Sequence, residues 1–244
     1  MTVPQRWLIA NWKMHGTRAS AASFAFHINQ QLAQAPAWLN VVFCPSFTAL
    51  EAAHAAMPAN ARLAIGGQNC AKDNEGAFTG GISAPMLKDC GAGYVILGHS
   101  ERRQIMYETD IQVEAKACTA IAAGLTPILC VGETLEEYEA GKTQDALARQ
   151  CNAFKTIQGH YLVAYEPVWA IGSGRTPKLG EIETAHNAIK SALGSTVSVL
   201  YGGSVKPTNI REILGGKGIC GALIGGASLQ LDSMRAMVET ASRE

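Results

Sequence analysis

The chain has 244 residues, of which 48% are hydrophobic and 16% charged, so it can bury a large core and does not have the composition of a disordered protein. Its 20 Lys and Arg residues balance its 20 Asp and Glu residues, which gives a formal net charge of zero. A neutral chain argues against a broad electrostatic surface for nucleic acid or for an anionic membrane.

Eight short apolar runs recur along the chain, with longer amphipathic stretches between them. Each run is too short for a helix, and several are continuously apolar rather than alternating, which is typical of parallel strands covered on both faces. The predicted strands are residues 7–10, 41–44, 63–65, 94–97, 127–131, 161–165, 197–201 and 221–224.

The stretches between the predicted strands carry helix signals. Thr17 precedes a segment that ends before Pro36, and Thr109 opens a segment that Gly124 stops. Further helix starts are predicted at Ser46, Thr134 and Pro207. This alternation, without a linker or low-complexity break, predicts an α/β fold in which one domain, residues 1–244, forms a closed parallel (β/α)8 barrel. An open doubly wound sheet of similar length is the alternative.

On such a barrel, the residues that directly follow each strand share one face and are candidates for chemistry. Lys13, after the first strand, is either a solvated lysine or part of an anion site. His99 follows the fourth strand, where Ser100 is positioned to cap a helix and Glu101 lies in its first turn. A histidine at a helix N-terminus feels positive potential, which favours the neutral imidazole, and a neutral ring can donate a hydrogen bond to a carbonyl oxygen.

Glu166 ends the sixth apolar run, where a carboxylate is either part of a structural salt bridge or a general base. The following segment has Pro167 and Pro177 at its ends and glycines in its middle. That composition suits a lid with stiff hinges and a tip that donates backbone N–H groups. The predicted lid comprises Pro167, Val168, Trp169, Ala170, Ile171, Gly172, Ser173, Gly174, Arg175 and Thr176.

Glycine pairs follow the seventh and eighth predicted strands, at residues 202–203 and 225–226. Such pairs let backbone amides approach an anion closely, although tight turns use them too. Together with Lys13 and Gly172, they predict a phosphate site. No GxGxxG or Walker sequence accompanies them, and a base and an electrophile without a cofactor suit proton abstraction next to a carbonyl.

Seven segments between residues 10 and 229 resemble triosephosphate isomerase in sequence, order and spacing. They are residues 10–14 (ANWKM), 76–80 (GAFTG), 97–103 (LGHSERR), 130–134 (CVGET), 164–172 (AYEPVWAIG), 201–205 (YGGSV) and 225–229 (GGASL). The resemblance implies a TIM-barrel isomerase of glycolysis and gluconeogenesis. Such an enzyme interconverts dihydroxyacetone phosphate and D-glyceraldehyde 3-phosphate through an enediolate, without a cofactor.

The resemblance also implies the roles of individual residues. Glu166 removes the substrate proton, His99 and Lys13 stabilise the enediolate oxygens, Asn11 supports them, and Glu101 belongs to the network beside Lys13. The remaining implied residues are the phosphate-binding backbone amides of Gly172, Ser204, Gly225 and Gly226 and the lid latch of Tyr201 and Ser204.

A homodimer is implied as well, through a loop at residues 74–82 that resembles the one inserted beside the partner's active site. Thr79 is kept, but Gly81 stands where the family usually carries Glu, and the missing carboxylate is expected to remove an interface ion pair with Arg102. Pro177 stands in the second lid hinge, where the family commonly has Ala. A proline fixes its own φ and restricts the backbone of the preceding residue, Thr176.

Two other functions fit parts of the pattern. Another phosphate-binding barrel isomerase or synthase shares the glycine pairs but not the combination of Lys13, His99 and Glu166. A non-catalytic protein that binds a phosphate metabolite is the second alternative, which a missing base or lid would support.

We expect a cytoplasmic protein whose partners are a small triose phosphate and a second copy of the chain. The start of the sequence lacks the pattern of a signal peptide, and no apolar run approaches the roughly 18 residues of a membrane helix. The seven cysteines include no CxxC pair and no metal-ligand spacing, so reduced thiols and no metal are expected.

Overall fold

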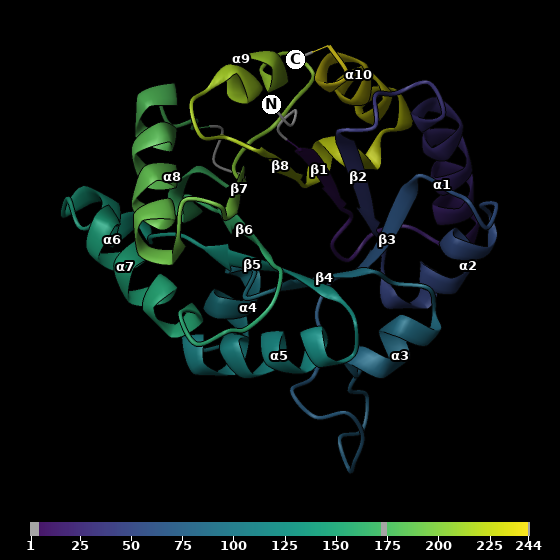
Figure 1. Ribbon diagram of the computed structural model, residues 1–244, viewed down its shortest axis with the longest axis horizontal. Helices are drawn as coiled ribbons and strands as arrows, with labels where there is room; N and C mark the ends of the chain where they lie inside the picture. Colours follow the sequence, from purple (N-terminus) through teal and green to yellow (C-terminus); the bar gives the residue numbers. More distant parts are fainter. Residues whose placement is uncertain (1–4, 172–174, 244) are drawn as a thin grey trace.

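The computed structural model describes residues 5–171 and 175–243. Within these residues, eight parallel strands close into a barrel in chain order, with the last strand paired to the first (Figure 1). The strands are β1 (Arg6–Asn11), β2 (Leu39–Cys44), β3 (Leu63–Gly67), β4 (Tyr94–Leu97), β5 (Thr126–Val131), β6 (Leu162–Tyr165), β7 (Ser198–Tyr201) and β8 (Gly221–Ile224). The closed barrel confirms the predicted fold class, and the open sheet is wrong.

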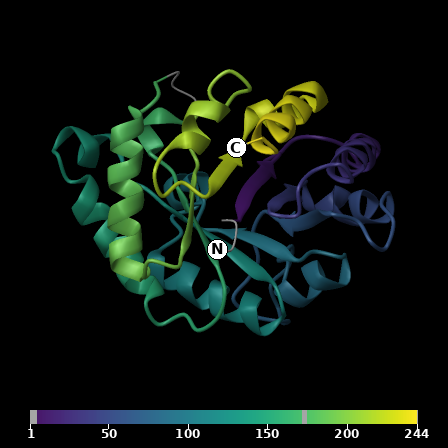
Figure 2. The same ribbon diagram turned by 45° about the horizontal axis from the view of Figure 1, so that its top comes forward.

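Helices surround the barrel on its outside, as both ribbon views show (Figure 1, Figure 2). In the described part of the chain they are α1 (Arg18–Leu32), α2 (Leu50–Ala55), α3 (Ala84–Asp89), α4 (Ser100–Ile105), α5 (Asp110–Ala122), α6 (Leu135–Glu139), α7 (Thr143–Phe154), α8 (Leu179–Leu193), α9 (Ile210–Gly215) and α10 (Leu231–Ala241), with short 3-10 helices η1 (Phe47–Ala49), η2 (Val168–Ala170) and η3 (Gly226–Leu229). No helix among the described residues is long and apolar enough to cross a bilayer.

The apolar runs within the strands do not alternate with polar residues because each strand separates two hydrophobic layers. In β1, Trp7 and Ile9 belong to the cluster that fills the barrel, whereas Leu8 and Ala10 belong to the cluster between the barrel and the helices. Successive side chains of a strand point to opposite faces, so a barrel strand with both faces covered has no polar side. All eight predicted strands are present, and their ends differ from the prediction by at most two residues.

The predicted helix starts have mixed outcomes. Thr17, Thr109 and Thr134 are confirmed as N-caps, because each side chain accepts a backbone N–H of the first helical turn. Ser46 precedes only the 3-10 helix η1 and makes no capping bond through its side chain. The start at Pro207 is wrong, since that residue lies in a turn and α9 begins three residues later.

Candidate active site

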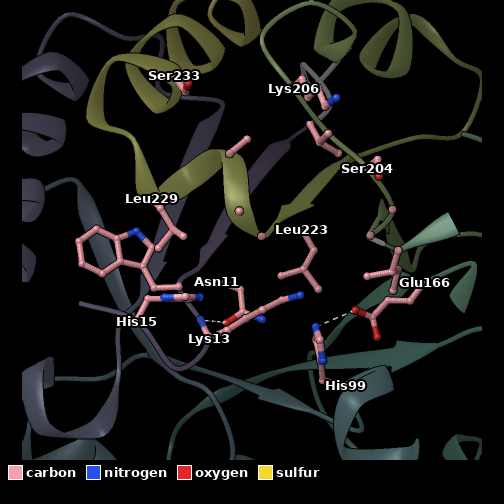
Figure 3. A pocket seen from close by; sticks show the side chains of 18 of the residues that line it. Asn11, Lys13, His15, His99, Glu166, Ser204, Lys206, Leu223, Leu229 and Ser233 are labelled. Carbon is pink, nitrogen blue, oxygen red and sulfur yellow. Dashed lines mark hydrogen bonds and ion pairs between the residues drawn. The ribbon is translucent and has the colours of Figure 1, made fainter. Parts of the chain in front are cut away.

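A cavity of about 690 Å³ opens where the carboxyl ends of the strands meet (Figure 3). Its walls come from the loops that follow β1, β4, β6, β7 and β8, segments that are far apart in sequence. The predicted site residues that line it are Asn11, Lys13, His99, Glu166, Ile171, Ser204, Gly225 and Gly226. The barrel therefore brings together, around one cavity, residues that were predicted from their places after the strands.

Glu166 and His99 point toward each other at this cavity (Figure 3). One carboxylate oxygen of Glu166 lies 3.0 Å from His99 Nε2, and the other accepts the backbone N–H of Ser100 at 2.8 Å. Glu166 is only 2% exposed, and a buried carboxylate requires such donors. The carboxylate is thus held against the first residues of α4.

The two side chains shift each other's protonation. Burial alone would raise the pKa of Glu166, but His99 and the Ser100 N–H lower it below its ordinary value. Burial alone would lower the pKa of His99, but the Glu166 carboxylate outweighs burial and raises it. Glu166 is therefore ionised near neutral pH, and the upward shift of His99 depends on that carboxylate.

His99 itself is the N-cap of α4, so the predicted Ser100 cap is wrong: Ser100 is the first residue of the helix. Nδ1 of His99 accepts the backbone N–H of Glu101 at 3.3 Å, whereas its distance to a Glu101 carboxylate oxygen, 3.6 Å, is too long for a hydrogen bond. An accepting Nδ1 leaves the proton of the neutral ring on Nε2, the nitrogen that faces Glu166. Burial by itself favours this neutral ring.

Lys13 is fixed from several sides. Its φ of 54° lies in the left-handed region that non-glycine residues rarely adopt. Its N–H donates to Asn11 Oδ1 at 3.0 Å, and its carbonyl accepts the side chain of Gln68 at 2.8 Å. Nζ of Lys13 lies 2.9 Å from Glu101 Oε1, which orients the ammonium group beside the cavity.

The glycine pairs make room for these charged side chains. A Cβ on Gly202 would lie 2.8 Å from Cγ of Glu166, and a Cβ on Gly225 would lie 3.3 Å from Cε of Lys13. Both positions therefore favour the smallest residue for a second reason besides the predicted approach of backbone amides to an anion.

Arg103 links the strand ends that carry the site. Its Nε donates to Gly98 O at 2.7 Å, and its Nη2 donates to Cys130 O at 3.1 Å. A salt bridge with Asp110 holds the guanidinium group in place. The backbone directly before His99 is thereby tied to the end of β5.

The first half of the predicted lid is anchored outside the cavity by Trp169. Its Nε1 donates to Glu133 Oε1 at 2.7 Å, and its ring stacks on Tyr138 with centroids 4.0 Å apart. Glu133 is fully buried, also accepts the hydroxyl of Tyr165 at 3.1 Å, and has its pKa raised by burial. From the sequence, Glu133 was identified only as part of the segment at residues 130–134, without a role, and Tyr138 was missed; Glu133 lies two residues after the end of β5.

The other predicted lid and latch residues are spread around the site. Ser204 Oγ donates to Ala170 O at 3.2 Å, a direct contact between the predicted latch and the lid. Tyr201 is fully buried, and its hydroxyl group packs so closely on Gly203 that a Cβ there would lie 2.1 Å from the hydroxyl oxygen. Pro167, Val168, Arg175 and Thr176 do not line the cavity, and Gly172, Ser173 and Gly174 lie outside the described residues.

The predicted dimer residues lie away from the cavity. Thr79 and Gly81 are exposed, and Nε of Arg102 lies 3.4 Å from Glu108 Oε1 of the same chain.

Two basic residues that sequence reasoning missed, His15 and Lys206, line the cavity. In the part of the chain that the structure describes, no three His, Cys, Asp or Glu residues are grouped as a metal ion would require.

A closed parallel barrel that sets a carboxylate, a histidine and a lysine around a glycine-walled cavity defines a class: barrel enzymes that move protons on small anionic substrates. Within that class, the chain belongs to the triosephosphate isomerase family, whose sequence model matches residues 6–241.

Individual relatives agree with this assignment over nearly the whole chain. The triosephosphate isomerase of Magnetococcus marinus is 43% identical over 251 residues, covering 96% of this chain and 98% of the relative. That of Ehrlichia chaffeensis is 42% identical and covers 93% of this chain and 92% of its own. The crystal structure of triosephosphate isomerase from Bartonella henselae is 35% identical, with a TM-score of 0.88 over 98% of this chain and 100% of that chain.

Proposed function

We propose that this site interconverts dihydroxyacetone phosphate and D-glyceraldehyde 3-phosphate, with Glu166 as the base and His99 as the acid. Membership of the family makes the chain an isomerase of this aldose–ketose type, which acts in glycolysis and gluconeogenesis. The observation that carries the residue assignment is the ionised Glu166 carboxylate 3.0 Å from His99 Nε2, in a cavity that Lys13 also lines.

The reaction starts when substrate displaces Glu166 from His99 and from the Ser100 N–H. The carboxylate removes a proton from the carbon next to the carbonyl, and the electron pair moves to the carbonyl oxygen to give an enediolate. Nε2–H of His99 and the ammonium group of Lys13 donate to its two oxygens, and aimed donors of this kind are each worth about 2.7–4 kcal/mol. Glu166 then returns a proton to the neighbouring carbon, while His99 moves a proton between the oxygens.

We assign the phosphate of the substrate to the side of the cavity formed by Ser204, Gly225 and Gly226. Their place among the lining residues, facing Lys13, supports the assignment. Gly172, predicted to add a further amide, lies outside the described residues. Phosphate binding then drives closure of the predicted lid, which protects the enediolate from losing its phosphate. The Ser204–Ala170 contact supports Ser204 as a latch, and Tyr201 is assigned to the same role.

We also propose a homodimer through the loop at residues 74–82, which projects from the barrel between β3 and α3 (Figure 1). Phe78 on this loop is 54% exposed, and Met14, Ile105 and Met106 are exposed on the loops and helix after β1 and β4. Exposed apolar side chains mark a protein interface where they form one patch, which we propose for these residues. Gly81 offers no carboxylate with which Arg102 could form an ion pair. Arg102 is instead paired with Glu108 of its own chain.

The chain is assigned to the cytoplasm as one domain, residues 1–244. Seven free cysteines support a reducing compartment, and the single closed barrel supports one folding unit.

The test is a coupled assay in both directions with the two triose phosphates, run on the parent and on Glu166→Gln. We expect activity in the parent and loss of at least about 100-fold in kcat for the variant, since a base contributes 10²–10⁴-fold. Glu239→Gln, on exposed α10 surface, is the matched control and should retain full activity.

Each competing function has its own outcome. Activity only on larger sugar phosphates would identify a different barrel isomerase, and tight binding without turnover would identify a binding protein. Undiminished activity of Glu166→Gln would remove the role assigned to Glu166.

A further inference from the structure

We infer that Gln150, on helix α7, is a positioning residue for Glu166. Gln150 does not line the cavity, so this role, which rests on the proposed function, involves no contact with substrate. Its side-chain amide instead fixes the backbone against which the base is held.

Gln150 binds both backbone polar groups of a single residue, Gly132. Its Oε1 accepts the Gly132 N–H at 2.8 Å, and its Nε2 donates to the Gly132 carbonyl at 3.0 Å. Gln150 is 6% exposed, so both bonds lie in the interior, where hydrogen bonds are strong and unpaired groups costly.

Gly132 needs such a partner because of its place at the end of β5. The strand ends at Val131, whose carbonyl accepts the Glu166 N–H at 2.7 Å, and the Glu133 carbonyl accepts the Val168 N–H at 3.2 Å. Backbone groups of successive residues in an extended chain point to opposite sides, so Gly132 points away from this pairing. The amide of Gln150 therefore supplies the partner that a neighbouring strand would supply.

On the same edge of β5, a second side chain pairs with the backbone where a neighbouring strand would otherwise do so. Arg103 donates to the Cys130 carbonyl, two residues before Gly132, where β4 has already ended at Leu97. Two side chains, Arg103 and Gln150, thus complete the edge that β4 leaves unpaired.

Gly132 is also in direct contact with the backbone of the base. A Cβ added to Gly132 would lie 1.7 Å from the Glu166 carbonyl oxygen, so the two backbones pack without a side chain between them. A displacement of Gly132 must therefore displace Glu166. It must also displace Glu133, the residue that anchors Trp169.

The test uses the fact that Gln150 is both a donor and an acceptor. In Gln150→Glu, a protonated carboxyl group keeps both bonds to Gly132, whereas the ionised group loses the donor and repels the Gly132 carbonyl. Arg103 lies on the same edge but is already paired with Asp110, so we expect burial to dominate and to raise the pKa of the new carboxyl group. Relative to wild type at each pH, kcat should be close to unchanged near pH 6 and fall about tenfold or more by pH 9, because small misplacements of a base are costly. KM should change much less than kcat.

Gln150→Met removes both bonds and should lower kcat at every pH. The matched control is Gln31→Met, since Gln31 donates to Arg235 O and links α1 to α10 away from the site. The control should lower stability without changing the pH profile of kcat. Circular dichroism at each pH separates a change in kcat from unfolding.

A Gln150→Glu profile parallel to that of wild type would overturn the inference. So would a loss of kcat that follows unfolding, or a Gln150→Met variant that behaves as Gln31→Met does. If Gln150→Met does not fold, the pH profile of Gln150→Glu decides. Full activity of Glu166→Gln would count against the proposed function, whereas an inactive Glu166→Gln beside an unchanged Gln150→Glu profile would count against the role of Gln150 alone.

Discussion

At the scale of single residues, the chemistry of the site depends on backbone groups of α4. The N–H of Ser100 holds the Glu166 carboxylate, and the N–H of Glu101 fixes the imidazole of His99 with its proton on Nε2. Both groups belong to the first turn of a helix, whose N–H groups have no partner within the helix. One helix start thus orients the proposed base and the proposed acid together.

Replacing His99 by Gln should reduce kcat by about 100- to 1,000-fold with a small change in KM, because it removes a donor that strengthens only as charge develops on the substrate oxygen. Steady-state kinetics of His99→Gln in both directions measure the effect. An increase in KM with kcat intact would mean that His99 binds substrate rather than stabilising the enediolate.

His186 provides a pH test that is independent of catalysis. It lies on α8 with its ring edge-on to Tyr165, and burial lowers its pKa to about 3 from an ordinary 6.5. Between these values the unfolded chain binds the proton and the folded chain does not. His186 therefore costs no free energy of unfolding above pH 6.5, and it lowers the free energy of unfolding progressively as the pH decreases toward 3.

His186→Leu should therefore make the thermal midpoint less dependent on pH across this acid range, measured by circular dichroism. His160→Leu, at an exposed position, is the control and should follow wild type. Equal slopes for His186→Leu and wild type would contradict the buried neutral imidazole.

Residue type and place along the chain were sufficient to make Glu166, His99 and Lys13 candidates, because each follows an apolar run, but their roles came only from the family resemblance. They could not indicate Gln150. In sequence it is an ordinary polar residue of a helix, and its partner Gly132 lies 18 residues away. Nor could they indicate that His99 rather than Ser100 caps α4, since this depends on the χ angles of the imidazole.

At the scale of elements, the strands could be predicted closely because burial on both faces leaves a continuous apolar run. The helices could be predicted where a threonine supplies the cap, as at Thr17 and Thr109. The start at Pro207 failed because the side chain of Asn209 accepts the Lys206 N–H at 2.8 Å and stabilises a turn before α9. The closure of the sheet depends on the register of β1 with β8, which no local pattern encodes.

The second hinge of the predicted lid offers a test at this scale. Pro177 is buried, and Pro177→Ala should change kcat by several-fold while lowering stability by no more than about 1 kcal/mol, since the substitution acts mainly on backbone freedom. Turnover and thermal unfolding measured on one preparation separate the two effects. Wild-type turnover in the variant would count against a hinge role.

At the scale of the whole molecule, the proposed dimer is expected to be weak because Gly81 brings no charge to the interface. The thermal midpoint should then increase with protein concentration. Gly81→Glu should raise the midpoint, and Gly81→Gln, which matches its shape without its charge, should raise it less. A Cβ at this position lies 3.0 Å from the Phe78 carbonyl, so the comparison of the two variants also cancels the local crowding. Equal midpoints for both variants would remove the ion pair from the explanation.

The proposed active site takes its groups from the loops after β1, β4, β6, β7 and β8, and the barrel closes only when β1 meets β8. Of the strand pairings in the barrel, that of the first strand with the last requires the longest chain closure, so it is expected late in folding. An intermediate with an open sheet would hold its hydrophobic layers while lacking any complete set of catalytic groups. Recovery of isomerase activity during refolding should therefore lag behind recovery of helical circular dichroism. Activity would then report only the molecules whose barrel has closed.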